Sequence, residues 1–298
     1  MPSSSELRGV YLPLVTPFSP SGDVDLGALE RIAHHFLDAG LAGLVALGTT
    51  GEPATLTASE RRSVVDVCSR VCVQRNAQLI VGPGSNNTAG TIADVGQLAD
   101  VAGVTAALVV VPYYTRPGQA GIVAHFTAVA DASPVPVVLY NIPYRTGEAL
   151  EPDGLLRLAS HPNIIGVKQS VGLDHAALRI LAESPPDFAV LCGEDPYLFP
   201  SAVLGGAGAI AASAHLCTER IVAMVDAGLN GRVEEGRAHH EALLSVIAAA
   251  FAEPSPTVIK GILHRGGLIA SAGVRLPLVA ASTAAVDRAM AAVAAVER

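Results

Sequence analysis

The chain has 298 residues, half of them hydrophobic and only 15% charged, so it can bury a sizeable core and is not expected to be disordered. Its net charge of −8 comes with no basic stripe, which argues against nucleic acid or an anionic membrane surface as a partner. No apolar run reaches the roughly 18 residues that cross a bilayer, and the four cysteines form no C-x-x-C motif, so we expect a soluble cytoplasmic protein with reduced thiols.

Short β-branched runs alternate with longer amphipathic stretches along most of the chain. The runs predict strands at 10–15, 42–47, 78–82, 106–111, 135–140, 163–168, 188–192 and 207–212. The stretches between them predict helices at 25–39, 58–74, 88–102, 118–132, 152–160, 174–183, 196–204 and 216–228, and Thr57 with Glu60 predicts a capping box. Eight strands, each followed by a helix, are typical of an α/β fold of the (β/α)₈ TIM-barrel class.

The last 70 or so residues have a different character. They are alanine-rich and helical in pattern, with breaks at 254–256 and 266–267 and an expected helix over 280–295. We therefore predict a barrel over residues 1–228 that carries the active site, and a C-terminal helical region over residues 229–298.

Lysine is rare in this chain, because only two of the 19 basic residues are lysines. One of them, Lys168, ends the apolar run at 163–168. A buried lysine can lose its proton and attack a carbonyl carbon to form an imine, which an arginine cannot do. The alternative is an ordinary strand-end lysine whose head reaches water. The second lysine, Lys260, follows no buried strand and is the weaker candidate.

The polar residues that follow the predicted strands support an active site there. In a barrel of this class the catalytic residues come from the carboxyl ends of the strands. Four of the six tyrosines fall in two of these segments, and phenols with an ordinary pKa near 10 can relay protons. The segments are 48–52, 112–114, 140–147, 168–170, 192–195 and 211–213.

Taken together, these segments resemble the family of dihydrodipicolinate synthase and N-acetylneuraminate lyase, the pyruvate-dependent class I aldolases. The resemblance covers almost the whole chain, and its motifs follow successive strands in order. They are Gly-Thr-Thr-Gly-Glu at 48–52, Tyr-Asn-Ile-Pro at 140–143, Gly-Val-Lys at 166–168, Gly-Gly-Ala-Gly-Ala-Ile at 205–210, Glu-Pro-Ser-Pro at 253–256 and Leu-Pro-Leu at 276–278.

The resemblance implies a role for each matching residue. Lys168 would form the imine with the ketone of pyruvate, so that no metal and no cofactor beyond this covalent imine is expected. Tyr140 would move protons, and Thr49 would link it to Tyr114, which in the family reaches in from a neighbouring subunit of a homotetramer built from dimers. Thr50 would hold the pyruvate carboxylate with Thr49, unless the two threonines only form a turn. Further substrate contacts are expected from Gly193 and Ile210.

The segment after the fifth strand discriminates between members of the family. Arg145 resembles the dihydrodipicolinate synthase branch, in which an arginine holds the carboxylate of L-aspartate semialdehyde and the product is 4-hydroxy-tetrahydrodipicolinate. A forked guanidinium suits a carboxylate, although Arg145 could instead form an intersubunit ion pair. The alternatives are an aldolase for a 2-keto-3-deoxy sugar acid, 4-hydroxy-2-oxoglutarate or N-acetylneuraminate, and a non-catalytic barrel that binds a keto acid.

Three residues near these motifs depart from the pattern of the synthases. Gln169 stands where they usually have an acidic residue, Tyr144 where they usually have a small one, and His215 where asparagine is frequent. None of them touches the imine chemistry, but Tyr144 beside Arg145 could reshape the pocket for the second substrate.

A further departure concerns regulation. Lysine-inhibited synthases carry a histidine and a glutamate in an allosteric cleft, where this chain has Arg61 and Gly90, although Asn86 is kept. We predict weak or absent inhibition by lysine, to be checked by a titration of turnover with L-lysine. Half-inhibition at sub-millimolar lysine would contradict this prediction.

Overall fold

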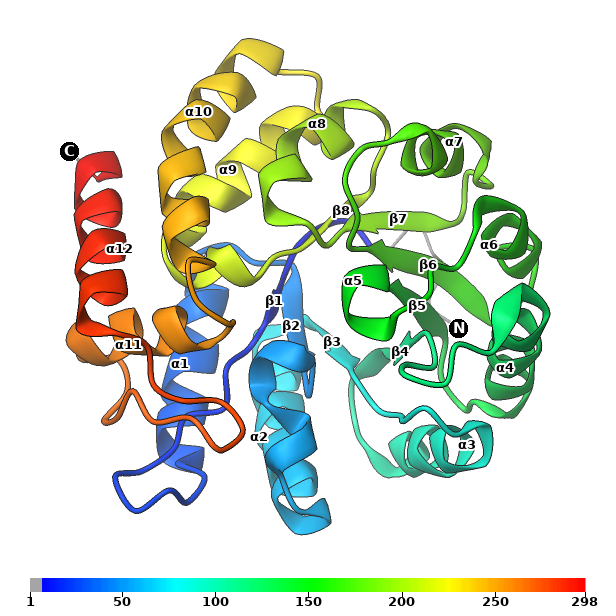
Figure 1. Ribbon diagram of the computed structural model, residues 1–298, viewed down its shortest axis with the longest axis horizontal. Coiled ribbons are helices and arrows are strands. Elements are labelled where there is room, and N and C mark those ends of the chain that lie inside the picture. Colours follow the sequence, from blue (N-terminus) through cyan, green and yellow to red (C-terminus); the bar gives the residue numbers. More distant parts are fainter. Residues whose placement is uncertain (1–6, 298) are drawn as a thin grey trace.

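Eight parallel strands pair in chain order and close on themselves where β8 meets β1 (Figure 1). The structure, a computed structural model, describes residues 7–297. The predicted (β/α)₈ barrel is confirmed, and each expected strand overlaps an observed one. The strands are β1 (Gly9–Pro13), β2 (Gly43–Ala46), β3 (Gln78–Val81), β4 (Val104–Val110), β5 (Val137–Asn141), β6 (Ile164–Gln169), β7 (Ala189–Cys192) and β8 (Gly208–Ile210).

Helices follow the strands and surround the barrel, as the amphipathic stretches predict (Figure 1). The capping box is present, since the Thr57 hydroxyl accepts from the Glu60 N–H at 3.2 Å and the Glu60 carboxylate accepts from the Thr57 N–H at 2.8 Å. One short helix, α5 (Pro143–Thr146), was not predicted. The others around the barrel are α1 (Leu26–Asp38), α2 (Ala58–Arg75), α3 (Thr88–Gly96), α4 (Gly118–Ala132), α6 (Pro152–Leu158), α7 (His175–Glu183), α8 (Leu198–Val203) and α9 (Thr218–Leu229).

The strands are apolar on both faces, which explains why they read as continuous runs in the sequence. Side chains alternate along each strand, so Val45, Ile80 and Leu191 pack with one another in one cluster, whereas their neighbours pack in the larger cluster that includes the helices. Tyr140 belongs to the first of these clusters. The interior is therefore filled by side chains, and in a barrel of this class a ligand site is expected at the carboxyl ends of the strands.

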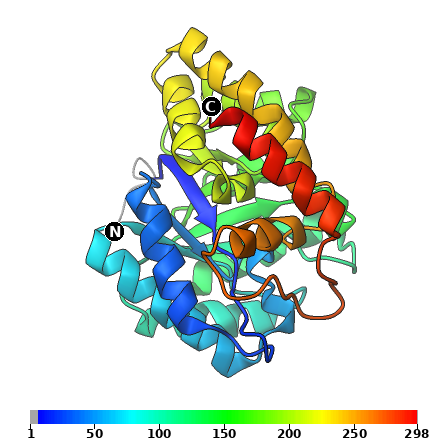
Figure 2. The ribbon, with the colours of Figure 1, turned by 90° about the vertical axis from the view of Figure 1, so that its left-hand side faces the viewer.

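The C-terminal region consists of α10 (Val233–Ala250), α11 (Thr257–Arg265) and α12 (Thr283–Val296). The helix α12, which covers most of the expected 280–295 segment, packs on both α10 and α11 (Figure 2). Small residues of α12, such as Ala285 and Ala289, let it approach Val258 and Ile262 of α11. The division at residue 228 stays a prediction.

The structure also bears on two expectations drawn from the composition, the absence of a membrane-spanning segment and the reduced state of the cysteines. Within the described part of the chain, no helix combines the length and the apolar character that crossing a bilayer requires. All four cysteines are buried and unpaired, and burial raises the pKa of the Cys68 and Cys72 thiols above the ordinary value.

His215 lies buried in the turn that follows β8. Its Nε2 accepts from the Val15 N–H at 3.3 Å, and its Nδ1 lies 2.8 Å from the Ala212 carbonyl oxygen. Burial lowers the pKa of His215 to about 4 from the ordinary 6.5. Between these values the unfolded chain binds more protons than the folded protein, so stability falls as the pH drops from 6.5 to 4.

We predict that His215→Asn removes this part of the pH dependence, because asparagine carries no titrating group. The free energy of unfolding of the wild type should fall by about 3 kcal/mol more than that of the variant between pH 7 and pH 4, as measured by denaturant titration. The exposed His35→Asn is the matched control and should behave as the wild type. Equal slopes for wild type and His215→Asn would contradict the prediction.

Candidate active site

A small cavity of about 40 Å³ lies where the carboxyl ends of the strands meet the loops that follow them. It gathers every catalytic and substrate-binding residue expected from the sequence except Tyr114. The expected residues that line it are Thr49, Thr50, Tyr140, Arg145, Lys168, Gly193 and Ile210.

Lys168 lies on β6 and is only 8% exposed. Its register partner on β5 is Tyr140, and its Nζ lies 4.3 Å from the centroid of the Tyr140 ring. Among residues 7–297, no carboxylate forms an ion pair with this amine. The amine therefore faces the cavity without being held by an acidic partner, as a nucleophile requires.

Gly193, directly after β7, makes room for the Lys168 side chain. A Cβ atom at this position would lie 2.6 Å from Lys168 Cε, 2.8 Å from its Cγ and 2.3 Å from Ser170 Oγ. No side chain tolerates contacts that short, so only glycine allows Lys168 its observed course.

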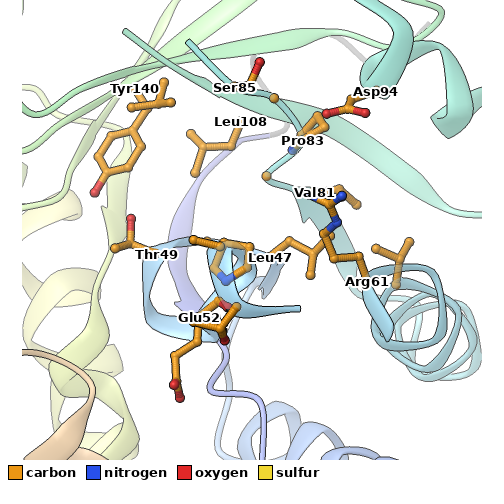
Figure 3. Close-up of a pocket in the computed structure, with 18 of the residues that line it drawn as sticks. Leu47, Thr49, Glu52, Arg61, Val81, Pro83, Ser85, Asp94, Leu108 and Tyr140 are labelled. Carbon is orange, nitrogen blue, oxygen red and sulfur yellow. Dashed lines mark hydrogen bonds between the residues drawn. The ribbon is translucent and has the colours of Figure 1, made fainter. Parts of the chain in front are cut away.

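Tyr140 and Thr49 approach each other from different strands. Tyr140 is the next-to-last residue of β5 and is buried, and Thr49 opens the 3₁₀ turn Thr49–Gly51 after β2. Figure 3 shows their hydroxyl groups pointing toward each other at the wall of the cavity. Both hydroxyl groups therefore face the space beside the Lys168 amine, where a phenol and an alcohol can take part in proton transfer.

The turn that carries Thr49 and Thr50 is fixed by hydrogen bonds on several sides. The Gly51 N–H donates to the Gly48 carbonyl at 2.8 Å, and the Thr16 hydroxyl donates to the Gly51 carbonyl at 2.7 Å. Thr50 is buried and lines the cavity. Hydroxyl and backbone N–H groups held in this way form an uncharged site for a carboxylate.

Arg145 lies in α5, at the mouth of the cavity. Its Nε donates to Tyr144 Oη at 3.3 Å, and its guanidinium carbon lies 5.3 Å from the centroid of the Tyr144 ring. Among the residues that the structure describes, Arg145 has no acidic partner, so its fork remains able to bind a carboxylate. Tyr144 also lines the cavity, which places its phenol where the second substrate would enter.

Gln169 helps to fasten the segment that carries Arg145. Its Oε1 accepts from Asn141 Nδ2 at 3.0 Å, and Asn141 in turn exchanges hydrogen bonds with both backbone groups of Leu150. Gln169 therefore accepts this hydrogen bond without placing a negative charge next to Lys168.

Tyr114 does not reach the cavity of its own chain. Its side chain is 88% exposed, and its backbone has a φ of 72°, a left-handed conformation that is unusual for so large a residue. The N–H of Tyr114 donates to the Thr146 carbonyl at 3.1 Å, which holds the loop against α5. A contribution of Tyr114 to a neighbouring copy stays a prediction.

Three further residues that line the cavity were given no role from the sequence: Asp195, Phe251 and Ser255. Asp195 is buried, and its Oδ1 accepts from the Ser213 N–H at 2.8 Å. Burial raises the pKa of Asp195, and hydrogen bonds from Ser213 oppose this shift. The signal for Asp195 was its place after β7. Phe251 and Ser255 come from the C-terminal region, and although Ser255 lies in the Glu-Pro-Ser-Pro motif at 253–256, nothing in that motif indicates that it lines the cavity.

A second, larger cavity of about 670 Å³ shares Thr49, Tyr140 and Arg145 with the first (Figure 3). Arg61 of α2 lines it, together with Tyr113 and Asp94. Asn86 Nδ2 donates to the Tyr113 carbonyl at 3.3 Å. Within residues 7–297, no three histidine, cysteine, aspartate or glutamate side chains gather so that they could hold a metal ion.

The chain is similar to known proteins over almost its whole length. The model of the dihydrodipicolinate synthetase family matches residues 6–296. A 4-hydroxy-tetrahydrodipicolinate synthase of Listeria welshimeri is 41% identical over 279 residues, which cover 92% of this chain and 93% of that protein. The solved structure of DHDPS from Cyanidioschyzon merolae with lysine bound has a TM-score of 0.93 at 34% identity and covers 98% of this chain and 99% of that one. The chloride-inhibited dihydrodipicolinate synthase of Acinetobacter baumannii, complexed with pyruvate, has a TM-score of 0.94 at 30% identity, again over 98% and 99% of the two chains.

We predict that Gly193→Ala lowers kcat by about 100-fold, because the new methyl group forces the Lys168 amine to move by about 1 Å. Steady-state kinetics of the folded variant measure this loss. The matched control is Gly172→Ala, since a Cβ there would meet its nearest neighbours, atoms of Tyr197, only at 3.6 Å. Wild-type kcat in Gly193→Ala would show that the course of Lys168 does not depend on Gly193.

Proposed function

The chain belongs to the dihydrodipicolinate synthetase family, and we propose that it is a lyase that condenses pyruvate with L-aspartate semialdehyde to give 4-hydroxy-tetrahydrodipicolinate. The observation that carries the proposal is the presence, in one cavity, of a buried lysine that forms no ion pair with any described carboxylate and of an arginine at the mouth. Lys168 suits a ketone and Arg145 suits a carboxylate, so the pair matches a keto acid and an acidic aldehyde.

The reaction begins with the keto acid. The neutral amine of Lys168 attacks the ketone carbon of pyruvate, and loss of water leaves a protonated imine. The Thr49–Thr50 turn holds the carboxylate through hydroxyl and N–H groups. Tyr140 donates the proton that lets the hydroxyl leave as water, and loss of a proton from the pyruvate methyl group then gives an enamine.

The second half of the reaction joins the aldehyde and releases the enzyme. Arg145 holds the carboxylate of the semialdehyde while the enamine carbon attacks its aldehyde carbon, and a proton is delivered to the new alkoxide. The amino group of the semialdehyde then attacks the imine carbon, which closes the ring and frees the Lys168 amine. The steps use no metal and no cofactor besides the imine.

The exposed position of Tyr114 supports an assembly of several copies of the chain. We propose a homotetramer built from dimers, in which the exposed Tyr114 of one copy lies beside Thr49 and Tyr140 of the next and extends their proton relay. Two observations support this proposal. The Tyr114 side chain is largely exposed, so its phenol packs little on its own chain, and the backbone at this residue is left-handed. We also propose a cytoplasmic location, in keeping with four buried thiols that are not paired.

The position of Tyr144 favours one second candidate, the same imine chemistry with another aldehyde. The Tyr144 phenol lines the cavity and contacts Arg145, so it shapes the space that the second substrate must enter. A 2-keto-3-deoxy sugar acid, 4-hydroxy-2-oxoglutarate or N-acetylneuraminate would then be the substrate in the cleavage direction.

The proposal predicts saturable consumption of pyruvate that depends on L-aspartate semialdehyde. Arg145→Ala should raise the KM for the semialdehyde by about 10- to 100-fold, because it removes a charge-assisted hydrogen bond, and should leave imine formation with pyruvate intact. Enzyme kinetics with each substrate varied in turn, and reduction of the pyruvate imine by borohydride, measure the two effects.

Lys168→Arg is the companion variant and should abolish turnover, since a guanidinium stays charged; turnover within about tenfold of wild type would contradict the assignment. Cleavage of the alternative substrates without any reaction of the semialdehyde would decide for the second candidate. Wild-type protein that forms no pyruvate adduct would indicate a barrel that only binds a keto acid.

A further inference from the structure

The second lysine of the chain lies in a buried ion pair. Lys260 of α11 has a fully buried side chain, and its Nζ donates to Glu52 Oε1 at 2.8 Å. The Glu52 side chain is only 1% exposed. Its other oxygen, Oε2, accepts from the backbone N–H of Arg275 at 3.0 Å. Both oxygens of this carboxylate are therefore bound by the C-terminal region.

A gain in folding stability does not by itself explain why the protein has this buried ion pair. The cost of taking two charges out of water offsets much of their attraction, and apolar residues of similar volume are often as stabilising. What a buried pair supplies is a fixed geometry, because each charge must meet its partner. The question is then which part of the molecule this pair fixes.

Glu52 belongs to the turn that is expected to hold the keto acid. It follows the 3₁₀ turn Thr49–Gly51 directly, and its N–H donates to the Thr49 carbonyl at 3.1 Å. Its backbone is left-handed, with a φ of 56°. In Figure 3 the Glu52 carboxylate points away from Tyr140, whereas the Thr49 hydroxyl points toward it; Glu52 lines the larger cavity but not the smaller one. The backbone of one short turn thus connects the threonines on one side with the buried carboxylate on the other.

A second layer of charges supports the pair. The ring of Phe18 lies 4.0 Å from Lys260 Nζ and 4.6 Å from the guanidinium carbon of Arg275, measured to the ring centroid. Arg275 also forms an ion pair with Glu60 of α2 at 2.5 Å and donates to the Thr55 carbonyl at 3.0 Å. Two cations and two carboxylates balance one another around a single ring, so the turn is joined to α2, α11 and the loop before α12.

Lys260 does not compete with Lys168 as the nucleophile. Its amine is occupied by the Glu52 carboxylate, and Lys260 lines neither of the two cavities. Its effect on the reaction must therefore pass through Glu52.

We propose that the Glu52–Lys260 pair, backed by Phe18 and Arg275, positions the Thr49–Thr50 turn for the carboxylate of the keto acid. Lys260 is then a positioning residue, and the C-terminal region takes part in substrate binding through it. This inference rests on the proposed function, since it assigns the pyruvate carboxylate to that turn.

The test separates positioning from stability by three variants. Glu52→Asp keeps both charges but shortens the carboxylate arm by one methylene group, and aspartate tolerates the left-handed backbone. The double variant Glu52→Gln with Lys260→Met removes both charges together and leaves no unpaired ion in the core. Val286→Ala is the matched control, because it weakens the packing of α12 on α11 without touching Glu52.

We expect the KM for pyruvate to rise by about tenfold or more in the double variant, and in the same direction but less in Glu52→Asp, because a displaced turn binds the carboxylate poorly. The KM for the semialdehyde should stay within about twofold of the wild type in both, and Val286→Ala should change neither constant. Thermal unfolding of each variant shows the loss of stability that a merely structural role would cause.

A folded double variant with the wild-type KM for pyruvate, or an equal rise in Val286→Ala, would overturn the inference. In that case wild-type protein would still form its borohydride-trapped pyruvate adduct. Absence of that adduct in the wild type would instead overturn the proposed function, and this inference with it.

Discussion

The parallel pairing of β5 with β6 is the constraint on which the site depends. Its register places Tyr140 opposite Lys168, and the same alternation turns both side chains toward the barrel axis. The phenol ring and the amine are thus brought to 4.3 Å by the sheet itself, without help from a flexible loop. Of the other expected residues that line the cavity, Thr49 and Thr50 follow β2, Arg145 follows β5, Gly193 follows β7, and Ile210 ends β8. Their distances from Lys168 are set by closure of the barrel at β1 and β8, and the apolar interior below keeps that closure rigid.

The two lysines differ in whether a carboxylate binds their buried amine. Both side chains are buried, and both lie over an aromatic ring, Tyr140 for Lys168 and Phe18 for Lys260. Lys260 meets the carboxylate of Glu52 and becomes part of the framework. Lys168 meets an open cavity and hydroxyl groups, so its amine is available to a carbonyl carbon. All other basic residues of the chain are arginines; one lysine lies beside the cavity, and the other forms a buried ion pair in which its compact ammonium group fits.

The sequence predicted the barrel well because strands buried on both faces appear as uninterrupted apolar runs. It also predicted Lys168, Thr49, Tyr140 and Arg145, since polar residues after such runs must meet at one end of the barrel. It did not predict Phe251 and Ser255 in the cavity wall, nor the pairing of Glu52 with Lys260 across 208 residues of sequence. Contacts of that kind leave no periodic pattern, because they depend on how the C-terminal helices dock. The partner of Tyr114 is not predictable from one chain either, since the residue faces away from its own cavity.

The central claim is that Lys168, and not Lys260, carries the keto acid. It is tested most directly by incubating the protein with pyruvate, reducing with borohydride, and mapping the modified peptide by mass spectrometry. The account predicts one reduced pyruvate adduct, on the peptide that contains Lys168, and none on the peptide that contains Lys260. An adduct at Lys260, or a wild-type protein that remains unmodified at saturating pyruvate, would contradict it.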